Sequence, residues 1–134
     1  MTIKPRRKLT AKERRDLDIE IGFMERLVKR DPHYMEALQV LSADYTKRGH
    51  YDDGLKIDRK LARLAPTDST VLYNLACSLS LTKRIRQSAA ALNKALDMGF
   101  QDCRMILRDP DLNNLRRDPL FDKIRMRLIV RDTR

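Results

Sequence analysis

The chain has 134 residues, the size of one ordinary domain, and its hydrophobic fraction of 42% is enough for a packed core. Its four glycines and five prolines are too few for a β-rich or linker-rich chain, which favours long helices. No stretch approaches the ~20 apolar residues of a membrane span, and the N-terminus lacks the apolar segment of a secretory signal. Two cysteines make a poor disulfide framework, so we expect reduced thiols in a cytoplasmic protein.

The net charge of +10 is concentrated at the two ends of this basic protein. Residues 1–15 carry seven basic residues and one acidic residue, residues 104–134 carry nine and five, and residues 16–103 are balanced at 13 each. Residues 1–10 offer no apolar face, so we expect a flexible tail that either binds anions or only aids solubility. The anion-binding candidates are Lys4, Arg6, Arg7, Lys8, Lys12, Arg14 and Arg15.

Helices are expected from residue 11 to the C-terminus. The first spans 11–30, and its apolar face consists of Leu17, Ile21, Met24, Leu27 and Val28. Four more are expected at 35–47, 52–64, 69–81 and 85–97, with breaks near Gly49 and Lys83. Short helical turns follow between 102 and 115, and a last helix lies near 119–130.

Residues 35–68 and 69–102 repeat with a period of 34 residues. The overlay places Leu38 on Leu72, Leu41 on Leu75, Ser42 on Ala76, Tyr45 on Leu79, Tyr51 on Ile85, Gly54 on Ser88 and Leu61 on Ala95. These residues recur three and four apart, as the buried face of a helix requires. The period predicts two antiparallel helical hairpins, with Gly54 and Ser88 where the helices approach most closely.

The segment after residue 102 contains two Asp-Pro pairs, which are typical of helix starts. Asp118 then opens a helix whose apolar stripe consists of Leu120, Phe121, Ile124, Leu128 and Ile129. An open stack leaves its last apolar face wet, so we expect this helix to cover the last hairpin around Leu92, Ala95 and Leu96. The alternative is that the stripe recruits a partner.

These features resemble the tetratricopeptide repeat family. The likeness is carried by Leu38, Leu41, Ser42, Tyr45, Gly49, Tyr51, Gly54, Leu61 and Pro66, and by Leu72, Leu75, Ala76, Leu79, Ile85, Ser88, Leu92 and Ala95. Asp58 replaces the usual aromatic residue, Glu20 a usual small one, and Gly99-Phe100 the closing proline.

The resemblance implies an all-α fold, a right-handed stack of antiparallel helical hairpins (an α-solenoid) with a C-terminal capping helix. One domain, 11–134, would contain a partial unit 11–34, full units 35–68 and 69–102, and a cap 103–134. Two full units fall short of the three or so that stability needs. The missing contacts must come from helix 11–30 and the cap, or from a second copy of the chain in a homodimer.

The resemblance also implies a concave groove lined by the first helix of each unit. The residues that would face it are Glu36, Gln39, Val40, Ala43, Lys47, Tyr73, Asn74, Cys77, Ser80 and Leu81. Such a mixture suits an extended peptide or a helix, although these positions can equally be solvated helix faces. The carboxylate clamp of some chaperone-binding members is not expected, because Gln39 and Ala43 stand where it needs Lys and Asn.

Catalytic and cofactor chemistry finds no support in the sequence. His33 and His50 lie in turns without a partner base or ligand, and Cys77 suits a small groove or core residue better than a nucleophile. There is no Gly-rich phosphate loop. We therefore expect no enzyme, no metal and no cofactor, but a protein-interaction adaptor or scaffold. The alternative is an RNA- or ribosome-associated accessory protein whose basic ends bind RNA or another acidic surface.

Overall fold

The computed structural model describes residues 8–132, and the regular structure within that range is entirely helical. The elements are α1 (Ala11–Arg30), α2 (Met35–Arg48), α3 (Tyr51–Leu64), α4 (Ser69–Leu81), α5 (Ile85–Asp97), α6 (Cys103–Arg108), η1 (Pro110–Leu112), α7 (Asn113–Arg116) and α8 (Phe121–Asp132). The first five helices agree with their predicted bounds to within one residue, and the short turns lie where they were expected. The last helix begins two residues later than predicted.

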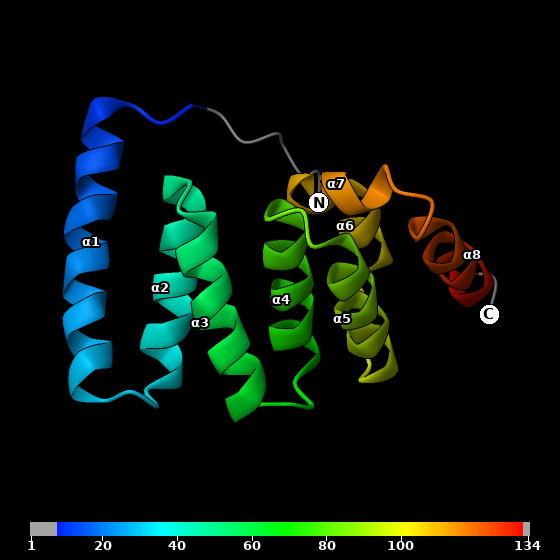
Figure 1. Cartoon of the computed structure of the whole chain (residues 1–134), viewed down its shortest axis with the longest axis horizontal. Coiled ribbons are helices and arrows are strands. Elements are labelled where there is room, and N and C mark those ends of the chain that lie inside the picture. Colours follow the sequence, from blue (N-terminus) through cyan, green and yellow to red (C-terminus); the bar gives the residue numbers. More distant parts are fainter. Residues whose placement is uncertain (1–7, 133–134) are drawn as a thin grey trace.

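The five long helices stand side by side in chain order, and each packs chiefly against the next (Figure 1). The short elements α6, η1 and α7 lie across one end of α4 and α5, and α8 follows at the edge of the stack (Figure 1). The predicted all-α stack of antiparallel helical hairpins with a C-terminal cap is confirmed.

The turn inside each hairpin repeats the 34-residue period in its hydrogen bonds. After α2 the His50 amide donates to the Tyr45 carbonyl at 2.8 Å, and after α4 the Arg84 amide donates to the Leu79 carbonyl at the same distance. Each turn needs one left-handed residue, which is glycine in the first unit (φ 87° at residue 49) and Lys83 in the second (φ 62°). A side chain in this conformation costs roughly 1–2 kcal/mol, so the second turn is strained where the first is not.

Gly54 and Ser88 lie at the helix crossings, as predicted. A Cβ atom added to Gly54 would lie 3.2 Å from Thr46 Oγ1 and 3.7 Å from the Ser42 carbonyl oxygen, so α3 approaches α2 closely there. Ser88 is fully buried, and its hydroxyl donates to the Ala76 carbonyl at 2.8 Å across the α4–α5 crossing. The two hairpins therefore close in the same way on a small residue.

The largest hydrophobic core forms where α4 and α5 meet the C-terminal cap. Phe121, Ile124 and Leu128 of α8 are at most 2% exposed and belong to the same cluster as Leu92 and Leu96 of α5. The expectation that α8 covers the last hairpin is therefore correct. The cap supplies contacts that a third repeat would otherwise make.

Two residues expected on the buried stripe of α8 are exposed instead. Leu120 is 45% exposed because it precedes the helix, in a turn where the Asp118 carboxyl accepts the Leu120 amide hydrogen at 2.9 Å. Ile129 is 52% exposed because it follows Leu128 by one residue, which turns it about 100° away from the buried side. The stripe is thus narrower than the sequence suggested.

The α1–α2 interface contains a buried carboxyl group. Asp44 is almost fully buried, and its Oδ2 finds no hydrogen-bond partner among the described residues. Burial raises the pKa of Asp44 to about 6, and the neighbouring Glu20 carboxyl group contributes to that rise. Glu20 is the residue that departs from the repeat pattern, so α1 packs with a carboxyl pair where a small residue is usual.

Candidate functional site

The stack holds a cavity of about 200 Å³ between α2 and α4. Its lining comes from α2, α3, α4 and the cap: Gln39, Ser42, Ala43, Thr46, Lys47, Asp58, Leu61, Val71, Asn74, Cys77, Ser78, Leu81, Asp109 and Asp111. The α2 members recur three and four residues apart, so they share one helix face. Six of the ten groove candidates lie together here, namely Gln39, Ala43, Lys47, Asn74, Cys77 and Leu81.

The other groove candidates lie elsewhere. Glu36 and Val40 are exposed on α2 outside the cavity. Tyr73 is 4% exposed, which differs from the expectation that it faces a ligand. Its ring stacks on Phe100 with centroids 4.3 Å apart. Ser80 is also fully buried, and its hydroxyl oxygen accepts the Leu115 amide hydrogen at 3.2 Å.

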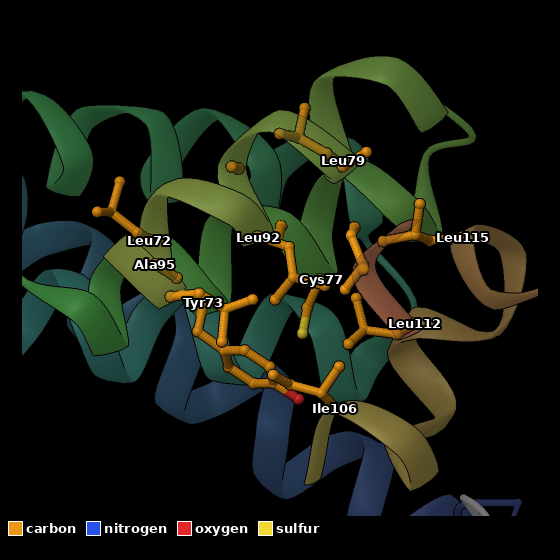
Figure 2. Close-up of a cluster of buried hydrophobic side chains, with 14 of the residues drawn as sticks. Leu72, Tyr73, Cys77, Leu79, Leu92, Ala95, Ile106, Leu112 and Leu115 are labelled. Carbon is orange, nitrogen blue, oxygen red and sulfur yellow. The ribbon is translucent and has the colours of Figure 1, made fainter. Parts of the chain in front are cut away.

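The cap accounts for the burial of these α4 residues. Figure 2 shows Tyr73 and Cys77 of α4 pointing toward Ile106 and Leu112 of the cap. A segment about 30 residues later in the chain thus covers part of the helix face that the family resemblance assigns to the groove. Helical periodicity identifies a face, but it does not show which part of that face another segment covers.

Asp58 forms the floor of the cavity and connects three helices. Ser42 of α2 donates its hydroxyl to Asp58 Oδ1 at 2.5 Å, and Ser78 of α4 donates to Oδ2. Burial raises the pKa of Asp58 to about 6, although the two hydroxyl hydrogen bonds act to lower it. The sequence marks Asp58 as a departure from the repeat pattern, but no local signal shows that both serines face it.

Asp109 forms the wall that the cap contributes. Its Oδ2 accepts the Tyr73 hydroxyl hydrogen at 2.6 Å and lies 3.9 Å from Cys77 Sγ, while its Oδ1 accepts the Asp111 amide hydrogen at 3.0 Å. The Asp-Pro pair is a helix cap, as predicted, and the fold gives it this second position beside α4. Burial, and then the charge of Asp109, raise the pKa of the Cys77 thiol, which therefore stays protonated.

A second hollow, of about 530 Å³, adjoins the cavity through Thr46 and Lys47, which line both. Its lining among the described residues is Lys8, Leu9, Glu13, Arg14, Thr46, Lys47, Arg48, Gly49 and Tyr51. Four of these side chains are basic and one is acidic, whereas the described lining of the cavity has three carboxyl groups and one lysine. Among these residues the lining therefore changes from acidic to basic along α2.

The anion-binding candidates are only partly brought together. Lys8 and Arg14 line the basic hollow, whereas Lys12 and Arg15 lie on α1 outside it. The remaining candidates, Lys4, Arg6 and Arg7, fall outside the described residues. The proposed tail boundary at residue 10 stays a prediction; Thr10 itself caps α1, where its hydroxyl accepts the Glu13 amide hydrogen at 3.1 Å.

No group of three or more His, Cys, Asp or Glu side chains within residues 8–132 is arranged to hold a metal ion. None of the helices in that range combines the length and apolarity that crossing a membrane requires. Both cysteines are buried free thiols.

The comparisons with known proteins give one informative similarity. No family model matches the chain. Over 103 residues the chain is 31% identical to a chloroplastic protein of Arabidopsis thaliana. The match covers 75% of this chain but only 29% of that protein, so the chain spans less than a third of this relative's length. The chain is thus distantly similar to part of a longer plant protein.

Proposed function

We propose that this chain is a small tetratricopeptide-type array that works as an adaptor or scaffold, without catalysis, by binding a peptide or helix of another protein on its concave side. The observation that supports this most strongly is the cavity between α2 and α4, where six of the predicted groove residues converge. Its lining combines polar groups such as Gln39 and Asn74 with apolar ones such as Val71 and Leu81, a mixture typical of peptide recognition.

The chemistry of the cavity favours binding over catalysis. Asp58 accepts hydrogen bonds from two serine hydroxyls, Asp109 accepts one from the Tyr73 hydroxyl, and the Cys77 thiol is protonated. Asp109 is the base beside that thiol, and burial and its charge raise the pKa of the thiol instead of activating the sulfur. The free thiols support a reducing compartment, such as the cytoplasm, as the proposed location.

The proposal is tested by filling the cavity and following the partner. Ala43 is exposed and lines the cavity, whereas Ala90 is exposed on α5 away from it, so Ala43→Arg and Ala90→Arg form a matched pair. We expect a partner that co-purifies with the wild-type chain from native lysate to be lost with Ala43→Arg and kept with Ala90→Arg. Equal loss or equal retention would contradict binding in the groove.

The basic hollow supports a second candidate function, association with RNA or the ribosome. Phosphate contacts weaken steeply between low and moderate salt, because they depend on counterion release. A partner that disappears on nuclease treatment, and with rising salt, while surviving Ala43→Arg, would favour this second function over the first.

A further inference from the structure

We infer that the concave side selects a peptide with segregated charges: a basic side chain in the cavity between α2 and α4, and an acidic group a few residues away in the basic hollow. This inference rests on the proposed function, since it specifies the peptide that the same surface would take. It goes beyond the repeat pattern, because the residues that set the charges come from α3, from the cap and from the segment before α1.

The cavity suits one long cationic side chain. Among the described residues, Asp58, Asp109 and Asp111 bring carboxyl groups to it from two separate parts of the fold, and Lys47 brings a cation. A carboxylate has about four lone-pair sites, so the oxygens of Asp58 can accept bonds beyond the two from serine. A volume of about 200 Å³ would hold roughly six or seven waters at about 30 Å³ each. An acidic side chain would instead add a further negative charge.

The hollow has the opposite preference. Lys8 and Lys47 have no ion pair among the described residues, whereas Arg48 is held by Asp18 at 2.9 Å and Arg14 donates to the Leu9 carbonyl at 3.0 Å. A carboxylate entering the hollow would meet cations from the segment before α1, from α1 itself and from the end of α2. Such charge-assisted bonds are stronger than neutral ones.

The two regions are close enough for one short segment. Along α2 the lining begins at Gln39 in the cavity and ends at Gly49 beyond the helix, where it belongs to the hollow. Ten residues of helix rise about 15 Å, which an extended peptide covers in about four or five residues. The basic and acidic groups of the ligand should therefore be about three or four residues apart, on either side of the shared residues Thr46 and Lys47.

The test uses the full chain and labelled six-residue peptides in fluorescence anisotropy. The probe has two arginines at one end, two glutamates at the other, and one serine and one alanine between, so that the nearest opposite charges are three residues apart, and it is made in both directions. The comparison peptides have the same composition with alternating charges, only arginines, or only glutamates. We expect one direction of the segregated probe to bind most tightly.

Single charge removals then assign each end of the probe. Asp58→Asn should weaken the probe about two- to five-fold while leaving the glutamate-only peptide unaffected, and Lys8→Gln should weaken it similarly while leaving the arginine-only peptide unaffected. The matched controls are Asp122→Asn on α8 and Lys94→Gln on α5, both exposed and away from the concave lining. Neither control should change the affinity.

The possible failures are distinguishable. Equal binding of segregated and alternating peptides, or tightest binding of the arginine-only peptide, would overturn the inference and leave groove binding intact. If the wild-type chain binds no peptide but a full chain with Lys4, Arg6 and Arg7 changed to serine does, the occupant is the chain's own basic segment and not a partner. Absence of binding to both chains would refute this ligand class, whereas the proposed function itself is judged by the Ala43→Arg and Ala90→Arg pair.

Discussion

Replacing Gly54 with leucine tests the closest helix approach in the stack. The first added atom, Cβ, would already lie 3.2 Å from Thr46 Oγ1 and 3.7 Å from both the Ser42 carbonyl oxygen and Tyr45 Cβ. Thr46 cannot rotate away without cost, because its hydroxyl donates to that same carbonyl at 3.1 Å. The three further carbons of leucine would have to separate α3 from α2.

Overpacking of this kind costs about 1–3 kcal/mol. For a chain of this length, 1 kcal/mol corresponds to a shift in melting temperature of about 3–5 °C. We therefore expect Gly54→Leu to lower the melting temperature by about 3–15 °C, measured by circular dichroism at 222 nm. Gly54→Ala should be close to neutral, because its gain of about 0.5–1 kcal/mol in helix propensity offsets the tight Cβ contact.

Gly22 provides the matched control. It also lies inside a helix, but a Cβ there would meet only the flexible end of Arg26, at 3.6 Å. Gly22→Leu should therefore leave the melting temperature unchanged or raise it slightly. If the two leucine substitutions had the same effect, the small residue at position 54 would not be required by packing, and the reasoning about the α2–α3 crossing would be refuted.

Three further outcomes are expected. Phe121→Ala should lower the free energy of unfolding in urea by about 3–5 kcal/mol, because the ring is fully buried. Met126→Ala, on the exposed side of α8, should lower it little, and equal losses would contradict a structural cap. Lys83→Gly should raise the free energy of unfolding in urea by about 0.5–1 kcal/mol by relieving the left-handed turn, and a lower value would argue against strain there. The free energy of unfolding of Asp58→Asn should rise relative to that of the wild type by on the order of 2–3 kcal/mol between pH 4 and pH 7. The folded pKa of about 6 exceeds the ordinary value of 3.8, so the wild-type protein must bury a charge as the pH rises, whereas the variant does not. Thermal melts of both proteins at each pH measure this, and a difference that does not change with pH would contradict it.

The sequence by itself determined the helices and their pairing. The 34-residue period, the Gly54–Ser88 correspondence and the Asp-Pro starts are local or regularly spaced signals, and each predicted helix lies where they placed it. Local signals suffice there because the 3.6-residue periodicity identifies the buried face of a helix wherever its partner comes from. The resemblance to the repeat family predicted six of the α2 and α4 residues that line the cavity.

Only the tertiary structure decided the character of that cavity. Asp58 receives hydroxyl hydrogen bonds from two serines 16 and 20 residues away, and Asp109 meets Tyr73 across 36 residues. The Asp58 contacts depend on how α2 and α4 pack around α3, and the Asp109 contact depends on how the cap folds back over α4. Neither spacing nor propensity encodes that packing. For this reason Tyr73 and Ser80, which the family resemblance assigned to the groove, are buried, while acidic groups from α3 and the cap line the cavity. Periodicity fixes the direction in which a side chain leaves its own helix, but the group that it meets is fixed by the packing of distant segments.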